Sequence, residues 1–114
     1  MRKIESIAFT SNQSIALKEL RKKLLDKFDI LTIILFGSFA RGESDLESDI
    51  DLLIVTRHPF KRPARHKITN VVFEINLKYD TNFSTVVVDQ ISWERGTFSV
   101  LPFHEEIIQQ GIPI

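Results

Sequence analysis

Apolar and polar residues recur with two different periods along this chain. Between Ser14 and Phe28 the apolar residues return every three or four positions among basic residues, which is typical of an amphipathic helix. Three short runs, over residues 29–36, 50–56 and 83–88, are rich in β-branched residues and end at glycine, proline or polar residues. These runs predict three strands, the first of them buried on both faces of a sheet.

Helical spacing returns twice more after the second strand. Pro63 suits a first helical turn, and the apolar residues of 68–79 follow at helical spacing. Short helices are expected over 92–95 and 103–110, the last one closed by Gly111 and stopped by Pro113. The unit 50–88 should then be a parallel strand–helix–strand crossover. We expect one domain over 1–114 of the α/β (α+β) class, with a small mixed sheet flanked by helices.

Length and composition restrict the class of protein. The 114 residues suit one hydrophobic core, and the absence of cysteine excludes disulfides and thiolate metal sites. No apolar run approaches the roughly 20 residues that span a bilayer. We therefore expect a cytoplasmic protein without a membrane partner. Fifteen basic residues balance fifteen acidic ones, so nucleic-acid binding is not expected either.

The balanced charge conceals two adjacent blocks of opposite sign. Residues 42–56 contain five acids and no Lys or Arg, whereas 57–67 contain five Lys or Arg and no acid. Such blocks are usually solvated surface. The acidic block differs because two of its members, Asp49 and Asp51, are two positions apart at the start of a predicted strand.

The candidate chemistry lies between the first two predicted strands. Gly37-Ser38 ends the first strand, and Asp49-Ile50-Asp51 opens the second. Side chains alternate along a strand, so Asp49 and Asp51 should project from the same face. Two adjacent carboxylates repel each other unless a cation lies near them, and carboxylate oxygens are ligands that Mg²⁺ selects. The pair therefore predicts a metal site.

Gly37 and Ser38 add a means of binding an anion. A glycine that ends a strand and opens a turn or helix can present backbone N–H groups, and the Ser38 hydroxyl is a further donor. A triphosphate held there beside a divalent cation would suit in-line attack on the α-phosphate with departure of pyrophosphate. Arg41 could face a phosphate or only solvate the turn.

The pattern from Gly37-Ser38 to Asp49-Ile50-Asp51 resembles the minimal nucleotidyltransferases of the DNA polymerase beta superfamily. The resemblance implies the nucleotidyltransferase fold, with elements in the order α-β-α-β-α-β-α over most of the chain. It implies Asp49 and Asp51 as catalytic metal ligands and Gly37 and Ser38 as phosphate-binding residues. From its position one turn after Ser38, we place Arg41 with them as a candidate nucleotide-binding residue. It also implies ATP or another nucleoside triphosphate as donor and Mg²⁺ (or Mn²⁺) as cofactor.

The chain departs from the superfamily in one respect. That superfamily uses a third carboxylate early in the strand after the crossover helix, but residues 83–88 contain no acid. If the second and third strands are parallel, Asp80 lies near the start of both and Asp89 lies at the far end. Asp80 is thus the better placed of the two, although its position in Tyr79-Asp80-Thr81-Asn82 also suits a turn residue.

Within this superfamily the chain resembles the antitoxin-type members, which pair with an all-helical partner protein and can transfer AMP to it. We expect such a toxin–antitoxin partnership in a homo- or hetero-oligomer, because the short chain offers no second domain to supply an acceptor. Two alternatives stay open. One is a binding module without turnover, because the third carboxylate is missing, and the other is a transferase acting on a small-molecule hydroxyl.

Overall fold

Four strands form one mixed sheet in the order β3-β2-β1-β4. The computed structural model describes residues 4, 7–45 and 47–114. The strands are β1 (Ile30–Phe36), β2 (Ile50–Thr56), β3 (Phe83–Asp89) and β4 (Ile112–Pro113). The helices are α1 (Ser11–Lys27), α2 (Gly37–Arg41), α3 (Arg62–Tyr79), α4 (Gln90–Glu94), the 3₁₀ helix η2 (Thr97–Val100) and α5 (Pro102–Gln110). The predicted class, a mixed sheet flanked by helices, is confirmed.

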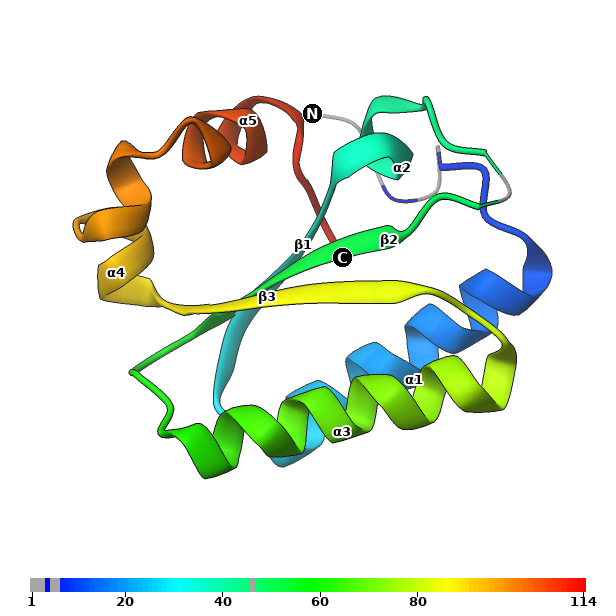
Figure 1. Ribbon diagram of the computed structural model, residues 1–114, viewed down its shortest axis with the longest axis horizontal. Helices are drawn as coiled ribbons and strands as arrows, with labels where there is room; N and C mark the ends of the chain where they lie inside the picture. Colours follow the sequence, from blue (N-terminus) through cyan, green and yellow to red (C-terminus); the bar gives the residue numbers. More distant parts are fainter. Residues whose placement is uncertain (1–3, 5–6, 46) are drawn as a thin grey trace.

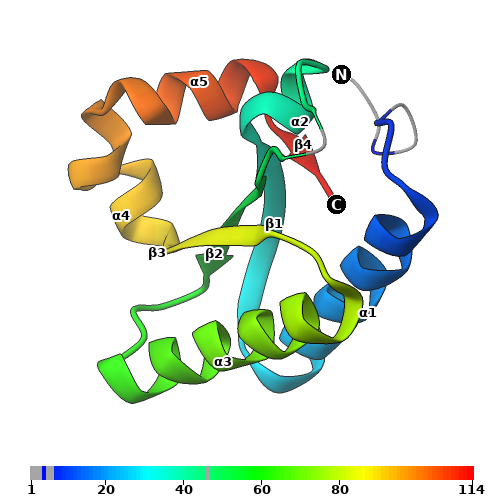
Figure 2. The ribbon, with the colours of Figure 1, turned by 45° about the vertical axis from the view of Figure 1, so that its right-hand side comes forward.

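The two faces of the sheet are covered by different helices. The long helices α1 and α3 pack side by side against one face, and the chain of α4, η2 and α5 arches over the other (Figures 1 and 2). The core is divided accordingly. Leu35, Leu52 and Ile54 join the cluster beneath α1 and α3, whereas Leu53 and Val55 join Trp93 and the other residues of the arch.

Strand β2 has the most enclosed position. All of its residues are buried except Asp51, which is half-buried. In β1, by contrast, burial alternates, because the side chains that face the arch stay partly exposed. The prediction that the first strand is buried on both faces therefore applies better to the second strand. The reason is that the short helices of the arch cover less of the sheet than α1 and α3 do.

Strands β2 and β3 are parallel, as the crossover predicted. Their register pairs Ile50 with Phe83 and Thr56 with Asp89. The Asn76 side chain holds the start of β3 in place, because its Oδ1 accepts hydrogen bonds from the Phe83 N–H at 2.9 Å and the Thr81 hydroxyl at 3.0 Å. The Ile50 N–H donates to the Asn82 carbonyl at 2.8 Å, which joins the starts of the two strands.

The start of α1 and the last residues of the chain differ from the sequence prediction. Helix α1 begins at Ser11, three residues early, because Thr10 and Gln13 form a reciprocal capping box. Residues 112–113 form β4, which pairs antiparallel with β1 opposite Ile34 and Leu35. Pro113 was expected only to stop the last helix. As a proline on an outer strand it leaves no ladder donor unpaired, so it is compatible with this pairing.

Charge is distributed unevenly between the two layers. Residues 7–29 and 57–80, which include α1 and α3, contain 11 Lys or Arg and 5 Asp or Glu. Residues 30–56 and 81–114, which include the sheet and the arch, contain 2 Lys or Arg and 9 Asp or Glu. The helical layer is thus basic and the opposite side acidic. Within the part of the chain that the structure describes, no helix is both long enough and apolar enough to cross a membrane.

Candidate functional site

The site residues predicted from the sequence meet where β1 ends and β2 begins. Strands β1 and β2 are antiparallel, and the last residue of β1, Phe36, pairs with Asp51. Gly37 then opens α2 with φ at +74°. A Cβ atom on Gly37 would lie only 2.2 Å from Asp51 Oδ2, so the Asp51 carboxylate packs directly against the glycine. Both the backbone angle and this close approach require glycine here.

Asp49 and Asp51 lie on the side of the sheet that the arch covers. Asp51 alternates with Ile50 and Leu52, which are buried beneath α1 and α3, and shares its side with Leu53 beneath the arch. Asp49, two residues before Asp51, is exposed. Both carboxylates are therefore available at the edge of the arch, beside the first turn of α2. Ser38 lies in that turn, and the N-cap residue of α2, Phe36, provides no side-chain hydrogen bond to the turn.

Electrostatic interactions tie this pair to the last helix. Burial raises the pKa of Asp51, the charge of Asp49 raises it further, Arg41 lowers it, and Glu106 raises it again. Arg41 Nη1 donates to Glu106 Oε1 at 2.7 Å, and Arg41 Nε donates to Glu43 Oε2 at 3.2 Å. The guanidinium of Arg41 is thus held by two carboxylates rather than lying free in solvent.

Glu106 was not identified from the sequence. It is 65 residues from Arg41 in the chain, so no local spacing relates the two. One signal was present: Glu106 follows Phe103 by three residues and precedes Ile107, both of which pack beneath the arch. Glu106 therefore lies at the border of the apolar stripe of α5.

The other acids of the 42–56 block have local roles. Asp45 Oδ1 accepts hydrogen bonds from the Glu47 N–H at 2.8 Å and the Ser48 hydroxyl at 3.2 Å, which organises the loop before β2. Glu43 pairs with Arg41, and the Glu47 side chain is exposed. The block thus separates into loop-forming residues and the pair Asp49 and Asp51.

The flanking acids occupy the ends of β3 that the parallel register predicts. Asp89 pairs with Thr56 at the far end of the sheet and caps α4, and hydrogen bonds from Ser92 hold the pKa of Asp89 below its ordinary value. Asp80 ends α3 in the left-handed conformation, with φ at +53°. The residue of β3 opposite Asp51 is Ser84, which is exposed. Asp80 therefore has the turn role that its local sequence also suggested.

The donor set suits a magnesium ion that is shared with a substrate. Among residues 4, 7–45 and 47–114, no group of three or more His, Cys, Asp or Glu residues could hold a metal ion alone. Mg²⁺ usually takes one or two carboxylates and completes its shell with water and substrate phosphates. Asp49 and Asp51 can supply those carboxylates, so the residues present fit a metal that arrives with a phosphate ligand.

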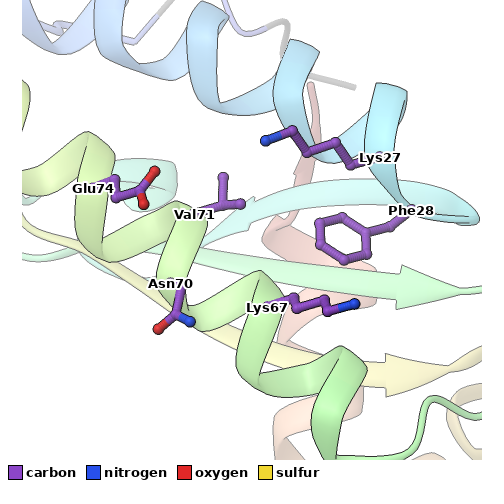
Figure 3. A pocket seen from close by; sticks show the side chains of 6 residues that line it. All are labelled: Lys27, Phe28, Lys67, Asn70, Val71 and Glu74. Carbon is purple, nitrogen blue, oxygen red and sulfur yellow. The ribbon is translucent and has the colours of Figure 1, made fainter.

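A separate pocket of about 270 Å³ lies in the basic helical layer. Figure 3 shows its lining at the end of α1 and along α3: Lys27, Phe28, Lys67, Asn70, Val71 and Glu74. These helices cover the face of the sheet opposite to Asp51. The pocket therefore takes no part in the chemistry considered for the acidic pair.

Comparison with known proteins agrees with this geometry. Residues 17–112 match the nucleotidyltransferase domain family. A relative from Methanocaldococcus jannaschii is 40% identical over an alignment of 77 residues that covers 64% of this chain and 52% of the relative. A second, from the same organism, is 32% identical over an alignment of 108 residues that covers 88% of this chain and 95% of the relative. Both carry names that describe them as candidate protein adenylyltransferases. The chain belongs to the nucleotidyltransferase domain family.

A solved structure extends the likeness of fold. One chain in the structure of a tri-AMPylated Shewanella oneidensis HEPN toxin in complex with MNT antitoxin aligns with a TM-score of 0.53 and 19% identity. The alignment covers 89% of this chain and 70% of that chain. The chain described here spans about half the length of the first of the two relatives above. The structural alignment and the family match confirm the nucleotidyltransferase fold that the sequence predicts.

Proposed function

We propose that this chain transfers AMP from ATP to a hydroxyl group of a partner protein. The acceptor oxygen attacks the α-phosphorus, the bond to the β-phosphate oxygen breaks, and pyrophosphate leaves with that electron pair while the hydroxyl proton passes to solvent. The observation that carries the proposal is the meeting of Asp49, Asp51 and Gly37 at one point, with the Asp51 carboxylate packed against the glycine.

Each site residue has a separate task in this proposal. Asp49 and Asp51 hold Mg²⁺ (or Mn²⁺), which when bound would neutralise phosphate charge and polarise the reacting oxygens. Gly37 lets the triphosphate approach the backbone without a side chain in the way. The Ser38 hydroxyl donates to a phosphate oxygen, and Arg41 supplies positive charge beside the triphosphate.

The acceptor is proposed by analogy with the relatives. The curated relatives are named as candidate protein adenylyltransferases, and the solved structure pairs an antitoxin of this fold with an AMPylated toxin. A partner protein, which we expect to be helical and to form a hetero-oligomer with this chain, would supply the hydroxyl.

The first experiment measures the thermal stability of the protein with Mg²⁺ and ATP. A ligand that binds only the folded state raises stability by mass action. We expect the rise to vanish in Asp49→Asn and Asp51→Asn. The matched control is Glu47→Gln, which removes an exposed acid from the same block and should keep the rise. Equal responses in the wild type and both Asp variants would overturn the site assignment.

A second experiment follows labelled AMP from ATP to a cognate helical partner. Transfer that depends on Asp49 and Asp51 would support the enzyme. A binding module without turnover is the other candidate, because Ser84 rather than an acid lies opposite Asp51. Mg²⁺-dependent ATP binding without transfer to any acceptor would favour that module.

A further inference from the structure

Arg41 lies beside the proposed triphosphate site, where its charge acts on Asp51, and that charge is already engaged. Glu106 binds Nη1 at 2.7 Å and Glu43 binds Nε at 3.2 Å. The Arg41 side chain is 32% exposed and that of Glu106 is 39% exposed, so solvent screens their pair only partly. The pair connects α5 to α2 across the edge of the arch.

The charges around the site are strongly unbalanced. Residues 30–56 and 81–114 contain only two basic residues, Arg41 and Arg95. Arg95 follows α4, which begins at the end of β3 remote from Asp51. Glu43 and Glu106 pair with Arg41, and the charges of Asp49, Arg41 and Glu106 all act on Asp51. A free triphosphate would therefore meet net negative charge, whereas a metal-bound one carries two fewer negative charges.

We propose that Glu106 is a specificity-determining residue that makes the site select the metal complex of a nucleoside triphosphate over the free triphosphate. The inference rests on the proposed function. Glu106 acts in two ways: it occupies a donor of Arg41, and it adds a negative charge on the same side of the sheet as Asp51. Both effects penalise the more highly charged ligand more, because electrostatic repulsion grows with ligand charge.

The choice of Glu106 follows from its position. Its neighbour Glu105 is exposed and accepts a hydrogen bond from Gln109 within α5, so it shares the helix but not the contact with Arg41. Glu43 is 67% exposed and lies two residues from Arg41, which makes it the more screened of the two partners. Substituting Glu106 therefore tests the contact between helices, and substituting Glu105 tests α5 alone.

The experiment measures ATP affinity by calorimetry, once in excess Mg²⁺ and once in EDTA. Metal-free ATP and Mg·ATP differ by two charges, so removing one nearby carboxylate charge is expected to change the ratio of their affinities about five- to tenfold. Glu106→Gln should therefore raise the affinity for metal-free ATP about five- to tenfold more than it raises the affinity for Mg·ATP. Glu106→Asp, which keeps the charge, and Glu105→Gln should both keep the wild-type ratio of the two affinities.

The outcomes separate this inference from the proposed function. If the wild type binds Mg·ATP through Asp49 but Glu106→Gln gains no metal-free binding, only the inference is overturned. A lower melting temperature for Glu106→Gln with an unchanged affinity ratio would reduce the residue to a structural link between α5 and α2, and it too overturns the inference. If the wild type binds no Mg·ATP, or Asp49→Asn binds it equally well, the proposed function fails and the inference fails with it.

Discussion

Replacing Gly37 with alanine tests the closest contact in the candidate site. Gly37 and Gly42 both have positive φ, +74° and +73°, so alanine at either position has a strained backbone. Non-glycine residues cost roughly 1–2 kcal/mol in this conformation. The more restricted unfolded chain returns about 0.4–1 kcal/mol. Backbone strain alone should therefore lower the free energy of unfolding by about 1 kcal/mol in each variant, or about 4 °C in melting temperature.

The two glycines differ in what a new Cβ atom would meet. At Gly42 there is nothing within 4 Å, whereas at Gly37 the Asp51 Oδ2 lies at 2.2 Å. The Asp51 carboxylate must therefore move by about 1 Å in Gly37→Ala, and misplacement of that size can reduce a reaction rate about a hundredfold. We expect Gly37→Ala to weaken Mg·ATP binding at least about tenfold, or about 1.4 kcal/mol. Gly42→Ala should bind like the wild type.

Thermal unfolding and calorimetry with Mg·ATP would measure both effects. A third variant separates strain from steric conflict: in an Asp51→Ala background, Gly37→Ala should cost no more stability than Gly42→Ala does. If Gly37→Ala binds Mg·ATP as tightly as Gly42→Ala, the close packing of Asp51 against Gly37 has no bearing on the ligand, and the reasoning is refuted.

Two further predictions concern the aspartates of β2 and β3. Because burial and the charge of Asp49 raise the pKa of Asp51 in the folded chain, ionising Asp51 destabilises the metal-free protein. Wild-type stability relative to Asp51→Asn should fall as the pH rises from below the ordinary carboxyl pKa through the raised one, and a difference that stays constant in melts across that range would contradict this. Asp89→Ala removes the cap of α4 and should lower the free energy of unfolding by about 1 kcal/mol. It should not change Mg·ATP affinity, and loss of binding in calorimetry would mean that the far end of the sheet belongs to the site.

Much of the architecture was accessible from the sequence because its signals are local. The three longer strands are runs of branched apolar residues between clear breaks, and β2 was located at its observed bounds, Ile50–Thr56. The strand–helix–strand unit predicted the parallel register, and this register placed Asp89 far from Asp51. The sequence also placed Gly37 at the end of the first strand and Asp51 at the start of the second, and the antiparallel pairing of β1 and β2 brings these two ends together.

The features that escaped prediction depend on contacts between distant segments. Strand β4 has only two residues, too few to show a period, and it exists because β1 offers a partner at Ile34 and Leu35. The contact between Arg41 and Glu106 joins residues far apart in the chain, and only the packing of α5 over the sheet brings them together. The early start of α1, in contrast, was legible in the capping sequence from Thr10 to Gln13.

The separation of charge between the two layers gives this chain a long-range field despite its formal charge of zero. A molecule of this kind behaves as a dipole, so charged molecules are oriented before they touch it. A basic acceptor would approach the side that carries Asp49 and Asp51, whereas an acidic molecule would approach α1 and α3. The Debye length falls from about 10 Å at 0.1 M salt to about 3 Å at 1 M. Added salt should therefore slow the association of each side of this neutral protein with molecules of opposite charge, as it does for a highly charged protein.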